Sequence, residues 1–270
     1  MAGNANPKTR NPTRGEDIVL QIEHLTKIYE DGTCALDDVS FTVNDGEFLV
    51  IIGLSGSGKS TLLRCINRLV EPTEGRILWD GEDITAASLD ELRRIRRRIG
   101  MIFQQFNLVK RSSVLTNVLS GRLGYVSTWR SITGQFSRHD VERAMQNVER
   151  VGIADKAHSR ADALSGGQQQ RVGIARALMQ EPALMLADEP VASLDPATSH
   201  SVLKYLEALN KQDGVTILCS LHFLSLARAY GTRIIALKDG RTVFDGLPVE
   251  IDEARFKEIY GEDAVRVEVL

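Results

Sequence analysis

The chain has 270 residues, of which 43% are hydrophobic and 26% charged, with a formal net charge of −3. This composition predicts a folded protein with a sizeable core, and the charge gives no global reason to expect a nucleic acid partner. The sequence has no apolar run long enough to span a membrane. Its three cysteines lack the spacing of metal ligands, which predicts reduced thiols in a cytosolic protein.

The first 17 residues are rich in Asn, Pro, Lys and Arg and polar throughout. They predict a mobile tail and not a signal peptide. From residue 18 to about residue 104 we expect strands and a phosphate-binding loop. The apolar, partly β-branched run 48–52 is typical of a buried parallel strand, and residues 61–66 predict a helix.

Between that strand and that helix lies the sequence Gly-Leu-Ser-Gly-Ser-Gly-Lys-Ser, residues 53–60. Its three glycines would let the backbone N–H groups point inward, and the helix dipole adds positive potential, which suits a triphosphate. Lys59 would reach the outer phosphates, and the Ser60 hydroxyl would ligate Mg²⁺. The alternative is an ordinary glycine-rich turn, which the Lys-Ser pair and the flanking elements disfavour.

An arginine-rich run occupies residues 93–98. Leu92, Ile95 and Ile99 would share one face of a helix, and Asp90 would pair with Arg94, so a solvated amphipathic helix explains the charges. An anionic membrane surface is a second interpretation. Nucleic acid binding is the least favoured of the three, because no groove-reading element accompanies the run.

Residues 105–168 predict a mostly helical insertion that ends in the pentapeptide Leu-Ser-Gly-Gly-Gln, residues 164–168. Ser165 is a natural N-cap for the helix that follows, so a second helix N-terminus becomes available for phosphate. The alternative is a capped helix that binds no ligand.

Five apolar residues, 183–187, predict a second central strand that ends in Asp188 and Glu189. In open α/β sheets the carboxyl ends of strands deliver side chains to the ligand crevice, so Asp188 would hold Mg²⁺ through water and Glu189 would act as general base. The alternative is an acidic pair that ends a strand at the surface.

Residues 215–220, 233–237 and 242–244 predict later strands, with Asp239 and Gly240 forming a hairpin turn. Asp195 precedes Pro196 and would by itself be a helix cap. His222 follows the first of these strands, where a lone histidine would more often be structural.

Taken together, the glycine-rich loop, the acidic pair and the pentapeptide resemble the nucleotide-binding subunits of ABC transporters, from about residue 18 to residue 261. The resemblance implies an α/β fold: a P-loop NTPase (RecA-like) core with an antiparallel β subdomain, and an inserted α-helical subdomain. The core would comprise residues 18–104 and 169–270, and the insertion residues 105–168.

The resemblance also implies individual roles. Tyr29 would stack on adenine, although a lone tyrosine is more often simply packed, and Gln104 would ligate Mg²⁺, unless its neighbour Gln105 does so. The pentapeptide would bind the γ-phosphate of ATP held by a second copy of the chain. Phe223 stands where many relatives carry a polar residue, which puts local contacts in doubt. The implied catalytic residues are Glu189, His222 and Gln104; the ATP contacts are Tyr29, Gly53, Ser55, Gly56, Ser57, Gly58, Lys59, Ser60, Thr61, Ser165, Gly166, Gly167, Gln168 and Asp195; the Mg²⁺ ligands are Ser60, Gln104 and Asp188.

Two longer stretches, residues 118–131 and 189–196, resemble the ATPase subunits of bacterial phosphonate importers. That resemblance implies integral permease subunits, an indirect extracytoplasmic binding protein, no nucleic acid partner, and a peripheral place on the cytoplasmic face of the plasma (inner) membrane. Trp129 would anchor the groove for the permease, or alternatively pack within the helical insertion. Phosphite or phosphate import remains the alternative cargo. A soluble ABC-type ATPase is disfavoured by the length of the chain, and a non-hydrolysing ATP-gated module by Glu189.

Overall fold

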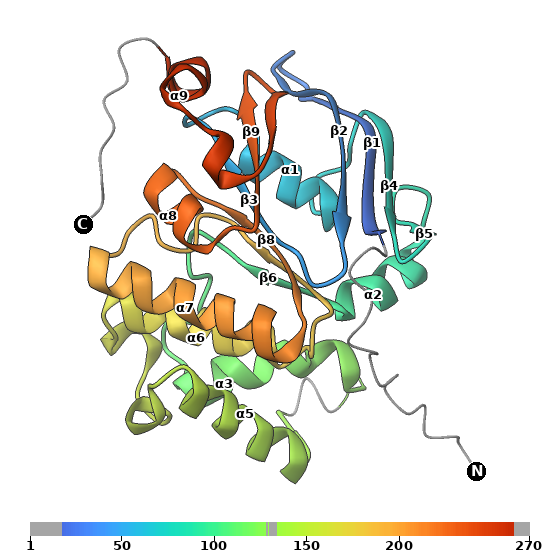
Figure 1. Ribbon diagram of the computed structural model, residues 1–270. Coiled ribbons are helices and arrows are strands. Elements are labelled where there is room, and N and C mark those ends of the chain that lie inside the picture. The colour runs from blue at the N-terminus through green and yellow to red at the C-terminus, as the bar shows by residue number, and fades with distance from the viewer. Residues whose placement is uncertain (1–17, 128, 130–133, 262–270) are drawn as a thin grey trace.

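The structure is a computed structural model, which describes residues 18–127, 129 and 134–261 (Figure 1). The tail predicted for residues 1–17 and part of the segment 118–131 lie outside the described residues. The chain forms a six-stranded sheet in the order β10-β9-β3-β8-β7-β6 and a four-stranded sheet in the order β2-β1-β4-β5.

Five strands of the six-stranded sheet run in the same direction, so their carboxyl ends lie together. Neighbouring strands are parallel, except that β10 pairs with β9 in the antiparallel direction. The central strands, and β6 at one edge, are buried along their whole length, as expected for a parallel sheet covered on both faces. Its strands are β3 (Phe48–Ile52), β6 (Ile99–Ile102), β7 (Leu184–Ala187), β8 (Thr216–Ser220), β9 (Arg233–Lys238) and β10 (Arg241–Gly246).

The four-stranded sheet is antiparallel, and its two long strands alternate between buried and exposed side chains over much of their length. It comprises β1 (Ile18–Ile28), β2 (Cys34–Asn44), β4 (Glu74–Trp79) and β5 (Glu82–Asp83). Together with the large sheet it confirms the predicted α/β core with an antiparallel β subdomain.

Two hydrophobic clusters divide the core at the large sheet. Leu49 and Ile51 of β3 pack toward the small sheet and α1 (Lys59–Ile66), whereas Phe48, Val50 and Ile52 belong to the cluster with α6 (Gly166–Leu178) and α7 (Pro196–Asp213). This alternation follows from the two-residue period of a strand. In Figure 1, α1 accordingly lies on one side of the sheet and α6 and α7 on the other.

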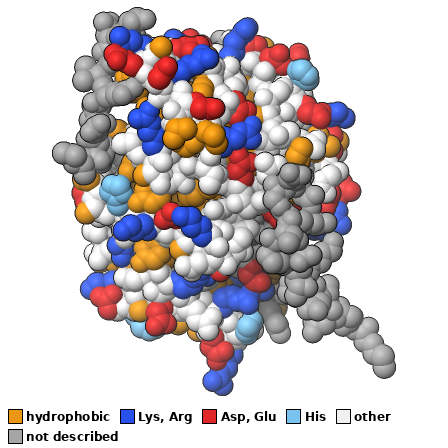
Figure 2. All heavy atoms as spheres, viewed as in Figure 1, with side chains coloured by type: hydrophobic (Ala, Val, Ile, Leu, Met, Phe, Trp, Pro, Cys, Tyr) orange, Lys and Arg blue, Asp and Glu red, His pale blue; other side chains and the backbone are white. Residues whose placement is uncertain are grey.

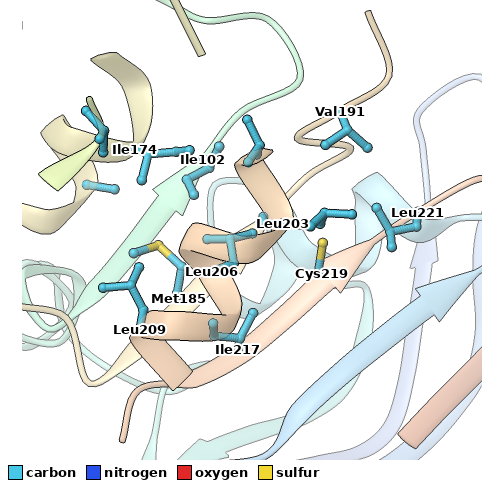
Figure 3. Packing of buried hydrophobic residues seen from close by; sticks show 14 of the residues in the cluster. Ile102, Ile174, Met185, Val191, Leu203, Leu206, Leu209, Ile217, Cys219 and Leu221 are labelled. Carbon is cyan, nitrogen blue, oxygen red and sulfur yellow. The ribbon is translucent and has the colours of Figure 1, made fainter. Parts of the chain in front are cut away.

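Figure 3 shows how α7 covers β7 and β8: Leu203, Leu206 and Leu209 of the helix face Met185 and Ile217 of the strands. Leu203 and Leu206 are fully buried. Burial of one such leucine contributes about 1.5–3 kcal/mol, so this contact holds the middle and second half of α7 against the sheet.

Helical elements predominate in residues 105–168, as predicted. They are α3 (Val114–Leu119), α5 (Arg138–Arg150) and the short 3₁₀ turns η1 (Ser120–Tyr125), η2 (Ala154–Lys156) and η3 (Ala161–Ala163). Tyr125 joins this insertion to the core, because its hydroxyl lies 2.9 Å from the carbonyl oxygens of both Arg97 and Gln180 and shares its one proton between them. The remaining helices are α2 (Leu89–Arg97), α8 (Leu224–Tyr230), α9 (Glu253–Tyr260) and the turn η4 (Pro248–Glu250).

The arginine-rich run forms the predicted helix, α2, with Leu92 and Ile95 buried, but two details of the prediction were wrong. Ile99 is the first residue of β6, because the helix ends at Arg97. Asp90 pairs with Arg93, one turn away, and not with Arg94.

Other arginines of the run have internal partners. Arg96 donates to the carbonyl oxygens of Asn67 and Arg68, just beyond the end of α1, at 3.0 and 2.6 Å. Arg98 pairs with Asp80 and lies over the ring of Trp79. The run therefore contributes to the packing of α2 against the core. On the face of the molecule that Figure 2 shows, basic and acidic side chains are interspersed.

Candidate active site

The glycine-rich loop joins β3 to α1 as predicted, and the helix begins at Lys59, two residues earlier than the sequence suggested. Gly53, Gly56 and Gly58 all have positive φ values, of 148°, 82° and 102°. A Cβ at Gly53 would collide with the carbonyl oxygen of Leu237, and one at Gly58 with that of Ala35. Only glycine fits these two positions without moving the backbone.

Lys59 is 3% exposed, and its ammonium donates to the carbonyl oxygens of Gly53 and Leu54 at 2.8 and 2.9 Å. Burial lowers the pKa of Lys59, and the nearby carboxylates Glu189 and Asp188 oppose that shift. The buried positive charge is thus stabilised by the two loop carbonyl oxygens and by the two carboxylates.

Asp188 follows β7 and is fully buried. Ser60 donates to its Oδ1 at 2.7 Å, Arg64 to its Oδ2 at 3.2 Å, and Ser220 to its Oδ1 at 3.3 Å. These partners come from α1 and from the end of β8, so the carboxylate ties the start of α1 to two strands of the sheet. The alternative in which the acidic pair merely ends a strand at the surface was therefore wrong.

Glu189 has a left-handed backbone (φ 47°), which is uncommon for a residue with a side chain and occurs often at functional sites. Its backbone N–H donates to Ser220 Oγ at 2.9 Å. His222 Nε2 lies 2.7 Å from its Oε1, and Gln104 Nε2 donates to its Oε2 at 2.8 Å. These contacts aim the carboxylate between the two side chains.

The hydrogen bond from His222 lowers the pKa of Glu189, against the opposing effect of burial, and Lys59 adds a smaller lowering. The carboxylate is thus ionised and available as a proton acceptor. Gln104, and not its neighbour Gln105, is the glutamine whose amide reaches this carboxylate.

The loop also holds a buried hydroxyl without a partner. Ser57 is 5% exposed, and within the part of the chain that the structure describes its Oγ makes no hydrogen bond. Ser55 is exposed at the tip of the loop, and Thr61 Oγ1 lies 3.3 Å from the hydroxyl of Tyr29. The ring of Tyr29 is partly exposed beside the first turn of α1.

The sequence of this chain is similar to that of a known protein family. A sequence profile of the ABC transporter family matches residues 36–192, more than half of the chain. The chain belongs to the ABC transporter family.

Curated relatives of this ABC protein align along almost their whole length. It is 56% identical over 247 residues to the phosphonates import ATP-binding protein PhnC of Bdellovibrio bacteriovorus, covering 91% of this chain and 95% of the relative. It is 57% identical over 244 residues to PhnC of Staphylococcus saprophyticus, covering 90% and 94%.

Solved cassettes share the fold. A dimeric cassette, MJ0796, bound to ADP and phosphate after hydrolysis, superposes with a TM-score of 0.76 at 37% identity and covers 85% of this chain and 98% of its own. The cassette MJ1267 in its ADP conformation gives 0.76 at 30% identity, covering 92% and 96%. The ABC ATPase fold is therefore shown for this chain.

The second group of predicted ATP contacts in this ABC protein lies at the N-termini of α6 and α7. Ser165 caps α6 in a reciprocal box with Gln168, and Asp195 caps α7 through the N–H of Thr198. The two caps adjoin, since a Cβ at Gly167 would lie 2.6 Å from a methyl carbon of Thr198. Among the described residues, neither cap makes a hydrogen bond or ion pair with the loop 53–60.

The exposure of the remaining predicted residues distinguishes between the alternatives considered for them. Trp129 is 75% exposed, so its packing inside the insertion was the wrong alternative. Phe223 is 40% exposed immediately after His222. The three cysteines are free thiols, and no helix in the described ranges has the length and apolarity needed to cross a membrane.

Two residues that bond to the acidic pair of this ABC protein, and a third that holds the segment after Gln104, were missed from the sequence. Arg64 lies one helical turn beyond Ser60, a spacing that could have indicated a shared partner in Asp188. Ser220 ends β8 and bonds to both acidic residues, as the carboxyl end of a parallel strand could have suggested. Arg176 of α6 donates to the carbonyl oxygens of Phe106 and Asn107, and no local sequence signal indicates this contact.

Proposed function

We propose that this chain is the ATP-hydrolysing subunit of a bacterial phosphonate importer, and that it acts as a pair of copies at the cytoplasmic face of the plasma membrane. The observation that carries the proposal is the position of Glu189, whose ionised carboxylate lies between His222 and Gln104 next to the lysine of the phosphate loop. A phosphate loop alone would support nucleotide binding, whereas this carboxylate supports hydrolysis.

ATP would bind with its phosphates in the loop 53–60. The backbone N–H groups and the N-terminus of α1 favour negative charge there. The ammonium of Lys59 would exchange its two carbonyl partners for phosphate oxygens, and the unpartnered hydroxyl of Ser57 offers a further donor. Tyr29 would contact the adenine; its hydroxyl, 3.3 Å from Thr61 Oγ1 beside the first turn of α1, supports this role.

In hydrolysis, Glu189 would take a proton from the attacking water while the bond between the γ-phosphorus and its bridging oxygen breaks. The leaving ADP keeps that bonding pair, and the water oxygen remains on the released phosphate. His222 would contact the γ-phosphate and orient Glu189, to which it already bonds. Acid–base assistance of this kind contributes about 10²–10⁴-fold in rate.

The predicted Mg²⁺ ligands are Ser60, Gln104 and Asp188. A serine hydroxyl, an amide oxygen and a buried carboxylate are the hard oxygen donors that Mg²⁺ prefers, and Ser60 already bonds to Asp188. The donor set therefore fits the ion. When bound, Mg²⁺ would neutralise part of the phosphate charge.

A second copy would complete each site. The capped N-terminus of α6, with Ser165, Gly166, Gly167 and Gln168, would contact the γ-phosphate held by the loop of the other copy, and Asp195 would lie at the same interface. ATP would then hold the two copies together until hydrolysis releases them, which links the chemistry to opening and closing. The dimeric MJ0796 cassette supports this arrangement by analogy.

Phosphonate as the cargo rests on relatives at 53–57% identity whose names state phosphonate import. The cargo would be selected by a separate binding protein and permease. Trp129, exposed in the helical insertion, would contact the permease.

The test is the ATPase activity of this chain assembled with its permease in lipid, with binding protein loaded with phosphonate, phosphite or phosphate. Stimulation by the phosphonate-loaded protein is expected. Stimulation only by phosphite or phosphate would support an importer ATPase but change its transported compound. Failure to assemble with any permease would contradict the proposed role in transport.

Trp129→Ala should reduce assembly with the permease while leaving ATP binding by the chain unchanged. Leu89→Ala is the matched control, since Leu89 is 70% exposed on α2, outside the insertion. Equal assembly of both variants, measured by co-purification, would remove Trp129 from the permease contact.

A further inference from the structure

The residue that orients Glu189, His222, lies in a short connection between two regular elements. β8 ends at Ser220 and α8 begins at Leu224, and Phe223 at the N-cap of α8 makes no side-chain cap bond. The N–H of Leu221 donates to the carbonyl oxygen of Ile51 at 2.9 Å, which fixes the connection before the histidine. This bond lies one residue before His222, so a further contact is required to fix the backbone of His222 itself.

Tyr260, 38 residues further along the chain, supplies that constraint. Its hydroxyl donates to the carbonyl oxygen of His222 at 3.2 Å. Tyr260 is the last residue of α9, which lies beside β9 and on the same side of the molecule as α8 (Figure 1). Burial raises the pKa of the Tyr260 phenol, so it remains a neutral donor at any pH at which the protein would work.

The position of α9 is itself fixed by contacts to the elements that carry the site. Phe256 and Ile259 are buried, and the ring centroids of Phe256 and Tyr260 lie 4.9 Å apart. The ammonium of Lys238, at the end of β9, donates to the carbonyl oxygen of Glu258 at 2.8 Å. The Tyr260 hydroxyl therefore belongs to a packed helix end and not to a mobile side chain.

A second bond joins α9 to the helix that follows the histidine. Arg228 of α8 donates to the carbonyl oxygen of Ile251, just before α9. The connection around His222 and the start of α9 are thus held together at two points, through Tyr260 and through Arg228. Because the His222 ring contacts Glu189 at 2.7 Å, a shift of the His222 backbone would move that contact.

We propose that Tyr260 is a positioning residue for ATP hydrolysis, which holds the backbone of His222 so that its imidazole meets Glu189. This inference rests on the proposed function, because Glu189 and His222 carry the hydrolysis there. Small displacements of a catalytic group lower the rate far more than they lower binding. Loss of the Tyr260 hydroxyl should therefore reduce kcat and leave the affinity for ATP unchanged.

The test is Tyr260→Phe in the full chain assembled with its permease in lipid. This variant keeps the ring that packs on Phe256 and removes only the hydroxyl. We expect kcat to fall about three- to tenfold, the factor that corresponds to one neutral hydrogen bond, with KM for ATP and the melting temperature close to wild type.

The chain offers a closely matched control in Tyr230→Phe. Tyr230, on α8, also donates its hydroxyl to the carbonyl oxygen of a histidine, His200, at 3.3 Å. Unlike the Tyr260 hydroxyl, it lies in addition 2.9 Å from Nδ1 of that histidine. If the general loss of a tyrosine–carbonyl bond lowered the rate, both variants would slow down. The proposal requires a fall in kcat for Tyr260→Phe alone.

A second measurement does not depend on turnover. In the full chain with ¹⁵N-labelled histidine, His222→Ala identifies the His222 ring signals, and Tyr260→Phe should shift those signals while Tyr230→Phe does not. A wild-type kcat in Tyr260→Phe, or an unshifted His222 signal, would overturn the proposal. Absence of hydrolysis in the wild type would instead contradict the proposed function, and the His222 signal would still decide the role of Tyr260.

Discussion

The two groups of residues expected to contact ATP differ in how far a single chain completes them. The glycine-rich loop 53–60, Asp188 and Glu189 form a connected network around two buried carboxylates, with bonds that join α1, β7, β8 and the exposed Gln104. The caps at Ser165 and Asp195 are satisfied locally and adjoin each other on the opposite side of the sheet from α1. Under the proposed function, the first region would carry out the chemistry within one chain, and the second would offer a helix N-terminus to a ligand held by another copy.

Glu189→Gln gives the largest expected effect, because it removes the proton acceptor while keeping the shape of the side chain. Hydrolysis should fall by about 10²–10⁴-fold, with ATP still bound and the paired state trapped. ATPase assays and size-exclusion chromatography with ATP measure the two outcomes. Wild-type turnover in this variant would contradict the assignment of the base.

Ser165→Ala tests the other region, and Ser137→Ala is its matched control. Both serines close a capping box, at α6 and at α5. Each substitution should lower the free energy of unfolding by about 0.5–2 kcal/mol, as measured by urea denaturation.

Only Ser165→Ala should in addition weaken ATP-dependent pairing, and it should lower hydrolysis by up to about 10²-fold, because one phosphate donor is lost. Parallel losses of activity in both variants would show that α6 matters only through stability. An unchanged rate in Ser165→Ala would remove this cap from the site.

The smallest expected effect concerns pH. The pKa of Glu189 is lowered from its ordinary value of 4.5, mainly by the bond from His222, so its ionisation stabilises the folded state above that value. This stabilisation should disappear as pH falls through the lower folded-state pKa. The difference in unfolding free energy between wild type and Glu189→Gln, measured by denaturation from pH 7 downward, should therefore narrow below about pH 4.5. A difference that is constant with pH would contradict the shift.

Local patterns predicted the parts of the site that depend on neighbours in sequence. The strand 48–52, the glycine-rich turn, the acidic pair after β7 and the cap at Ser165 could all be derived from a few adjacent residues. The hairpin at Asp239 and Gly240 was also correct, with φ values of 50° and 78°.

The predictions were wrong or incomplete where contacts between residues distant in sequence determine the structure. Ile99 fits the apolar face of α2 by spacing, yet it starts β6 because pairing with β7 outweighs one further helical residue. The partner of Ser220 lies 32 residues away at Asp188, and that of Tyr260 lies 38 residues away at His222. No local periodicity encodes such pairs.

Cross-linking between two chains that each carry one added cysteine, in a Glu189→Gln background, asks directly whether a second copy completes the site. One chain carries Ser55→Cys at the exposed tip of the loop, and the other Gly166→Cys. A side chain at Gly166 would meet its nearest neighbour, Phe106, at an ordinary 3.7 Å.

Both chains carry Cys34→Ser, because Cys34 is exposed. The two remaining cysteines are buried, and burial raises their thiol pKa, to about 12 for Cys65, so they should not react. The account predicts that a bifunctional thiol reagent gives a product of twice the chain mass when the two variants are mixed with ATP, and none without ATP. No product with ATP, or equal product without it, would contradict a site completed by a second copy.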